Sequence, residues 1–186
     1  MSPRRHVRAP NRSCGAAAVE TVLLLPLLVL LALPVADLAR ALQARLILDA
    51  ISREGASLAA RGTLPLQDAS QSIMDTLAAT APPLDMRRDG MLFVSRIMGS
   101  PSGPLVLEQY RWLGGGLDAA VAAAGCAGWD AAGRCAQQGG PVMLDAGTAP
   151  DDGEVVHVFE AHYRFRPWFG TLMPGLASDM HVQTLF

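Results

Sequence analysis

SCGAAAVETVLLLPLLVLL, residues 13–31, is the stretch that decides the fold of this 186-residue chain. Its apolar run is interrupted by a single carboxylate, Glu20, and continues as far as Ala36. As a helix, residues 16–36 would be about 31 Å long at roughly 1.5 Å per residue. The hydrocarbon core of a bilayer is about 30 Å thick. The stretch therefore predicts a transmembrane helix at residues 16–36.

Charged residues on either side of this helix predict its orientation. Four arginines and no acidic residue precede it, and Asp37 is the next charge after Glu20. The positive-inside rule places such an N-terminus in the cytoplasm and the remainder in the periplasm. A cleaved signal peptide would also start with arginines, but this run is long and leucine-dense, and no small-residue stop closes it. We therefore expect an anchor in the bacterial inner membrane.

The residues around Gly15 form an ordered pattern. A short basic leader ends at Gly15, Ala16 follows, and Glu20 is the fifth residue after the glycine. This order resembles the processing signal of type IV pilin-like proteins. The segment GAAAVETVLLLPLLVLL is most similar to the TadE-like minor pseudopilins of tight-adherence (Flp-type) pilus systems. Thr21 follows the glutamate, where the pseudopilins of that system usually carry an aromatic residue.

The resemblance implies specific partners for this segment. A prepilin peptidase would cut between Gly15 and Ala16, and the new Ala16 amine of one subunit would pair with Glu20 of its neighbour. An intramembrane carboxylate calls for such a partner, because an unpaired charge is costly there. Alternatively, Glu20 lies within a turn of the interface and is solvated by headgroup water. The other expected partners are pilin-like subunits, the pilus assembly machinery and the inner membrane.

The chain beyond the membrane is predicted to divide into a helical continuation and a small domain. Residues 37–62 keep a helical period, and their alanines and Gly55 would permit close packing, either on the chain's own domain or on another helix. The apolar residues at this period are Leu38, Leu42, Ile47, Ile51 and Leu58. A second helix is expected around residues 66–77, between Pro65 and the Pro82-Pro83 pair.

Strand patterns dominate the rest of the chain. Residues 91–98, 105–113 and 155–165 are rich in β-branched and aromatic residues, and the last of these segments alternates apolar with polar residues. The final HVQTLF is a candidate fourth strand, and GSPSGP at residues 99–104 is typical of a hairpin turn. The predicted fold is α+β: a long N-terminal transmembrane and amphipathic helix, followed by a small antiparallel β-sheet domain, as in pilins.

The three cysteines separate by compartment. Cys14 lies in the leader at residues 1–15, whereas Cys126 and Cys135 lie in the predicted extracytoplasmic domain at residues 63–186. Processing would remove Cys14 and leave a pair that can form a disulfide in an oxidising compartment. Free thiols are the alternative. A metal site at these cysteines is disfavoured because no other Cys or His is close in sequence.

Enzymatic and nucleic-acid-binding patterns were not found. His157 and His162 would face opposite sides of one strand, and His181 stands alone in sequence. No phosphate-binding glycine loop or nucleophile elbow is present. A net charge of −2 and 5% aromatic residues do not favour a nucleic-acid partner. No catalytic residue, metal ligand or cofactor is therefore expected.

Two classes of function remain. The first is a minor pseudopilin or pilus-assembly subunit of a tight-adherence or type IV-like pilus or secretion system, processed after Gly15 and assembling through its N-terminal helix. An uncleaved assembly component that stays in the membrane belongs to the same class. The second is a signal-anchored periplasmic binding or enzymatic domain with no pilus role, for which the helix is only a tether.

Overall fold

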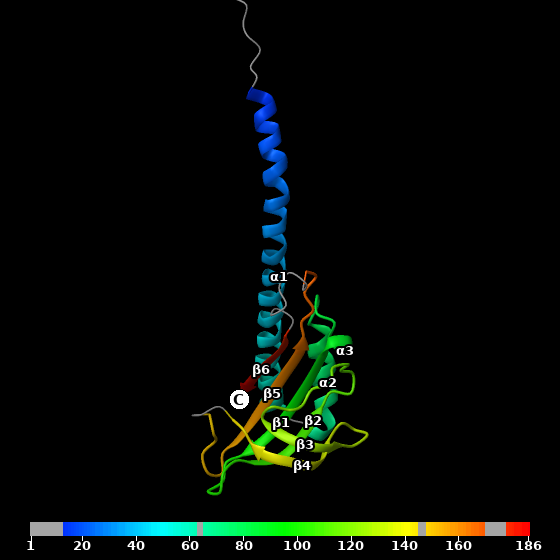
Figure 1. Ribbon diagram of the computed structural model, residues 1–186. Coiled ribbons are helices and arrows are strands. Elements are labelled where there is room, and N and C mark those ends of the chain that lie inside the picture. Colours follow the sequence, from blue (N-terminus) through cyan, green and yellow to red (C-terminus); the bar gives the residue numbers. More distant parts are fainter. Residues whose placement is uncertain (1–12, 63–64, 145–147, 170–177) are drawn as a thin grey trace, which may run out of the picture.

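One long helix and a small mixed domain make up the computed structural model, in which the helix projects from the domain like a stalk (Figure 1). The structure describes residues 13–62, 65–144, 148–169 and 178–186, without the side chains of residues 13–17, 140 and 141. The predicted leader at residues 1–15 lies outside this part except for its last three residues. The α+β architecture predicted from the sequence is confirmed.

Helix α1 (Ser13–Arg61) is 49 residues long and continuous. Pro26 and Pro34 both lie inside it. Membrane helices tolerate proline where neighbouring groups or local adjustments satisfy the freed carbonyls. The helix ends beside Gly62, whose N–H donates to the carbonyl of Leu58. The helix is therefore one element that joins the predicted membrane segment to the domain that follows it.

The two other helices are short. Helix α2 (Leu66–Ala79) follows Pro65, as predicted, and buries Leu66, Met74 and Leu77. Helix α3 (Met86–Asp89) is a single turn, whose N-terminal end is capped by the Asp85 side chain. It was not predicted, because four residues are too few to show a helical period.

Four antiparallel strands form the main sheet in the order β2-β1-β5-β6. Their bounds are β1 (Gly90–Met98), β2 (Leu105–Arg111), β5 (Val155–Arg164) and β6 (Asp179–Leu185). All four lie where the sequence predicts strands. Across the sheet Val94 is opposite Phe159, and Ala161 is opposite Val182. Because side chains alternate between faces, Phe159 and Ala161 face α1, and Val158 and Glu160 face away from it.

Helix α1 packs on β5 and β6 through small residues. Ala44, Ser52 and Ala56 are fully buried there, and the Ser52 hydroxyl donates to the carbonyl of Phe159 at 2.9 Å. A Cβ atom at Gly55 would lie only 2.6 Å from the Phe159 ring. Glycine is therefore needed for the helix backbone to approach the sheet this closely.

The predicted apolar face of α1 is correct only at its centre. Ile51 is buried and Ile47 partly buried, but Leu38, Leu42 and Leu58 are exposed. The helical period alone could not identify the inward face, because apolar residues occur on two sides of this segment. Close packing on the sheet selected the side on which small residues let the backbone approach, together with the buried Leu48 and Ile51.

A β-hairpin covers the opposite face of the sheet. Strands β3 (Ala124–Trp129) and β4 (Cys135–Val142) pair with each other, and the Trp129 ring stacks on Phe93 of β1 with 5.8 Å between centroids. The sequence did not predict this hairpin, since its strands contain mostly Gly, Ala and other residues that are not β-branched. The domain thus has three layers: helix, sheet and hairpin.

Candidate functional site

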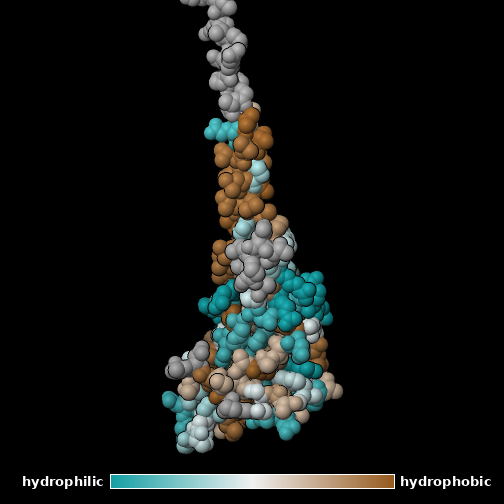
Figure 2. All heavy atoms as spheres, viewed as in Figure 1, coloured by the Kyte–Doolittle hydropathy of each residue, from teal (hydrophilic) through white to brown (hydrophobic). Residues whose placement is uncertain are grey.

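The N-terminal half of α1 exposes an almost continuous apolar surface. Leu23 and Val22 are 70% exposed, and the large apolar residues from Val19 to Val35 are all exposed except Leu33, which is partly buried. In Figure 2 this part of the helix is a brown column that stands clear of the domain. Helix residues Ala18–Arg61 include a window long and apolar enough to cross a membrane. In water such a surface would be strongly unfavourable, so it requires lipid or other helices.

Gly15, Ala16 and Glu20 occupy neighbouring turns at the start of this helix. Gly15 and Ala16 belong to α1, although their side-chain surroundings lie outside the described part of the chain. Glu20 is exposed and has no ion-pair partner among the residues that the structure describes. The Glu20 side chain is therefore exposed on the surface of the described part of the helix.

Exposed leucines continue along α1 beyond the predicted membrane segment. Leu38, Leu42 and Leu46 are spaced at four residues, and their exposed fractions are 46%, 58% and 70%. From Ala18 to Leu46 a helix spans about 43 Å, more than the roughly 30 Å of hydrocarbon in a bilayer. Lipid tails therefore cannot cover the whole apolar surface. Leu42 and Leu46 also line a groove of about 650 Å³ beside the edge strand β6.

The comparison with protein families concerns this same helix. The family model described as TadE-like protein matches residues 15–57. The chain is TadE-like over this segment. The resemblance inferred from Gly15, Glu20 and the leucine-rich run is thereby confirmed. No curated protein and no solved structure matches the chain.

The TadE-like helix is tied to the domain at the end of the predicted membrane span. Asp37 is only 1% exposed, and its carboxylate accepts hydrogen bonds from the backbone N–H groups of Trp168 and Phe169 at 3.0 and 2.7 Å. Arg40 donates to it at 3.0 Å. Burial tends to raise the pKa of Asp37, but these hydrogen bonds outweigh burial and hold the pKa below its usual value. The charged carboxylate thus fastens the chain after β5 to the helix.

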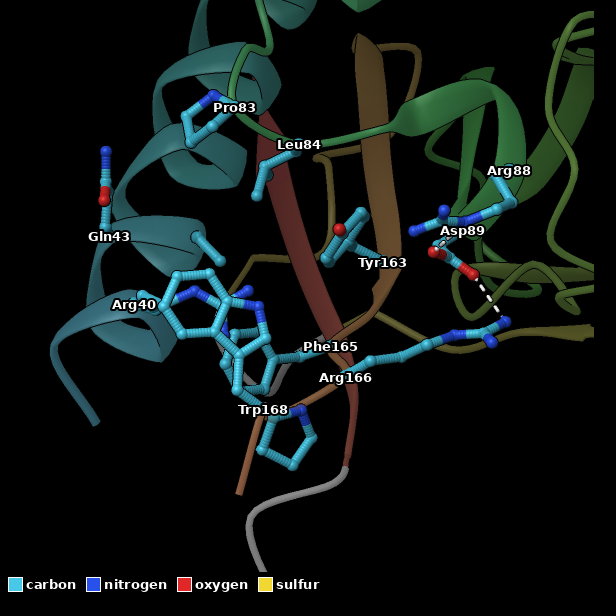
Figure 3. A pocket seen from close by; sticks show the side chains of 12 residues that line it. Arg40, Gln43, Pro83, Leu84, Arg88, Asp89, Tyr163, Phe165, Arg166 and Trp168 are labelled. Atoms are coloured by element: carbon cyan, nitrogen blue, oxygen red, sulfur yellow. Dashed lines mark hydrogen bonds and ion pairs between the residues drawn. The ribbon is translucent and has the colours of Figure 1, made fainter. Parts of the chain in front are cut away.

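A cavity of about 520 Å³ adjoins this attachment (Figure 3). The Arg40 guanidinium lies over the Trp168 ring, 3.8 Å from its centroid. Asp89 is only 2% exposed. Its two carboxylate oxygens form ion pairs with the guanidinium groups of Arg88 and Arg166, at 2.7 Å each. Every guanidinium of the cavity therefore has a carboxylate partner within the chain. These contacts explain how the segment after β5 is held.

A second polar cluster lies on the hairpin side of the sheet. Glu160 is fully buried in β5, and its two carboxylate oxygens accept the backbone N–H groups of Ala122 and Ala123 at 2.8 Å each. His162 Nε2 lies 3.2 Å and His181 Nε2 3.5 Å from Glu160 Oε2. The expectation that His181 stands alone is wrong, because the antiparallel register places it directly opposite His162. Only the pairing of β5 with β6 reveals this cluster.

The environment of Glu160 stabilises its charged form. Burial tends to raise the pKa of the carboxyl group, but hydrogen bonds from His162, His181, Ala122 and Ala123 lower it to about 2, from an ordinary value of 4.5. The carboxylate also links the loop at residues 122–123 to the sheet. The charged Glu160 side chain therefore helps to hold this loop against the sheet.

The remaining residues singled out in the sequence, the two cysteines of the domain and His157, lie in strands. Cys126 and Cys135 form a disulfide between β3 and β4, with 5.9 Å between their Cα atoms. His157 belongs to the face of β5 that carries Phe159, opposite to His162. The disulfide thus closes the hairpin that the sequence did not reveal.

Proposed function

We propose that this chain is a minor pseudopilin or pilus-assembly subunit of a tight-adherence (Flp-type) or type IV-like pilus or secretion system. The TadE-like family suggests a pilus-associated protein, and the matched segment is the helix. The observation that carries the proposal is the exposed apolar surface of α1, which is longer than the hydrocarbon core of a bilayer is thick. A helix that served only as a tether would not need exposed leucines outside the membrane.

The proposed topology places the leader at residues 1–15 in the cytoplasm and the span at residues 16–36 in the bacterial inner membrane. The helix continuation at residues 37–62 and the domain at residues 63–186 would lie in the periplasm. The four leader arginines favour this orientation. The disulfide between Cys126 and Cys135 agrees with an oxidising compartment for the domain.

In this proposal the N-terminal segment is first the substrate of a peptidase and then the helix through which the chain joins its neighbours. A prepilin peptidase cuts after Gly15 and leaves Ala16 with a free amine. Glu20 of a neighbouring pilin-like subunit then pairs with that amine. The absence of an ion-pair partner for Glu20 among the described residues supports this role. Outside the membrane, the face formed by Leu38, Leu42 and Leu46 packs on the helix of the neighbouring subunit.

The proposal is tested by the mass of the mature chain. We expect intact-mass analysis to give a chain that starts at Ala16 when it is purified from cells with a prepilin peptidase. Cells without the peptidase should yield the full-length chain. A full-length chain from both would rule out processing and leave two candidates, the uncleaved assembly component and the signal-anchored periplasmic domain. Co-purification with pilin-like subunits would then separate these two.

The leucine face gives an independent prediction. The double variant Leu42→Gln and Leu46→Gln should weaken co-purification with pilin-like subunits by at least about tenfold, because each buried leucine contributes about 1.5–3 kcal/mol. Both side chains are exposed in the isolated chain, so its free energy of unfolding should change by less than about 0.5 kcal/mol. Ala60→Gln, exposed on the same helix, is the matched control. Undiminished co-purification of the double variant would exclude this face as the contact.

A further inference from the structure

Three potential metal ligands converge on the hairpin side of the sheet. Glu160 and His162 are two residues apart on one face of β5, and His181 is opposite His162 on β6. The two imidazole rings lie 4.5 Å apart between centroids. Both Nε2 atoms are directed at the same oxygen, Glu160 Oε2, at 3.2 and 3.5 Å. Glu160 is fully buried, and the side chains of His162 and His181 are 13% and 36% exposed.

Hydrogen bonding alone does not account for this convergence. A carboxylate oxygen offers about two acceptor positions. The Ala122 N–H occupies one position on Oε2 at 2.8 Å, so the two imidazoles compete for the other and share it as weaker hydrogen bonds. Without a cation, each imidazole nitrogen is therefore only partly satisfied. A cation between the three atoms would satisfy all of them at once, and it would also offset the buried charge of Glu160.

The separations agree with tetrahedral coordination. Zinc binds imidazole nitrogen and carboxylate oxygen at about 2.0–2.2 Å, which places neighbouring ligand atoms of a tetrahedron about 3.3–3.5 Å apart. The two measured separations are 3.2 and 3.5 Å, and all three ligand atoms lie within 4.8 Å of one another. Two imidazoles and one carboxylate are a donor set that zinc commonly takes.

We propose that Glu160, His162 and His181 bind a divalent transition-metal ion, with zinc as the preferred ion. The fourth position would be taken by water on the side of the partly exposed His181 ring. The bound ion would join β5, β6 and the loop at residues 122–123, because Glu160 holds that loop through Ala122 and Ala123. The site would therefore brace the free edge of the sheet, beside the groove lined by Leu42 and Leu46.

In the test, zinc chloride alone is titrated into the full chain in detergent, and binding is measured by calorimetry. All samples carry the substitutions His6→Ala and Cys14→Ser, so that the leader supplies no competing metal ligands. We expect one zinc ion per chain and a higher unfolding temperature with zinc than with a chelator. Substitution of cobalt should produce the visible absorption of a four-coordinate ion.

Variants decide whether these residues are the ligands. His181→Ala should weaken zinc binding by at least about 100-fold, because losing even a partner of a ligand costs about 10- to 100-fold. His162→Gln should do the same. His157→Ala, on the opposite face of β5, should bind zinc as the parent chain does. No zinc binding by the parent, or equal binding by His181→Ala and His157→Ala, would overturn the proposal; a circular dichroism spectrum like that of the parent verifies that each variant is folded.

Discussion

Glu20→Ala is expected to weaken association of this chain with other pilin-like subunits by at least about 100-fold. Breaking a buried ion pair by removing one partner costs about 3–5 kcal/mol, and every 1.4 kcal/mol is a factor of ten in affinity. In the proposed assembly the lost partner is the Ala16 amine of a neighbouring subunit. Insertion into the membrane should be unaffected, since removing a charge makes the helix more apolar.

A graded series separates charge from shape at this position. Glu20→Gln keeps the size of the side chain but not its charge, and it should be as defective as Glu20→Ala. Glu20→Asp keeps the charge and should recover part of the association. Co-purification from membranes measures the effect, and alkali extraction verifies insertion. If Glu20 pairs with the amine of its own Ala16, one helical turn away, or stays solvated by headgroup water, all three variants will associate normally.

Glu160→Gln should lower the free energy of unfolding of the domain by about 3 kcal/mol at pH 7. The change from pKa 4.5 to about 2 corresponds to that amount, at about 1.36 kcal/mol for each pKa unit. An amide in place of the carboxylate presents only one oxygen to the backbone N–H groups of Ala122 and Ala123. One of these donors would then lose its acceptor, and a buried donor without a partner is destabilising.

The same carboxylate predicts how stability depends on pH. Its pKa is lower in the folded than in the unfolded chain, so its contribution is fully present above pH 4.5. As the pH falls from 4.5 towards 2, the unfolded state takes up the proton first and the contribution is lost. Stability of the parent chain should therefore decline over this interval. In Glu160→Gln this part of the pH dependence should be absent.

Urea unfolding of the full chain, followed by tryptophan fluorescence in detergent, measures both effects. A chelator in every sample separates them from metal binding. Glu54→Gln is the matched control, because Glu54 is exposed on α1, and its effect should stay within about 0.5 kcal/mol. Equal stability of Glu160→Gln and Glu54→Gln would show that the buried carboxylate contributes little.

Local physical rules were enough to predict the long helix and the four main strands. A leucine-dense run of 21 residues has few alternatives to a membrane helix, and the alternation in residues 155–165 is specific to a half-buried strand. The hairpin of β3 and β4 escaped prediction because its stability comes from packing on Phe93 and from the disulfide, rather than from its own residues. Such long-range contacts leave no period in the sequence.

The candidate sites also differ in whether the sequence alone could predict them. Gly15, Ala16 and Glu20 are close along the chain, so their spacing alone could be compared with a known processing signal, and the TadE-like match covers them. The cluster at Glu160 combines residues from two strands with a loop almost forty positions earlier. Its third member, His181, could be assigned only after the register of β6 against β5 was known.

The sequence by itself therefore determined that this chain has an anchoring helix, which strands follow it, and which family its N-terminal segment resembles. These features depend on neighbours within a few turns or residues. Only the tertiary structure decided which face of α1 packs on the sheet, leaving Leu38, Leu42 and Leu46 outward, and which polar groups meet at Glu160. Those outcomes depend on close packing and strand register, which join residues that are far apart in the chain.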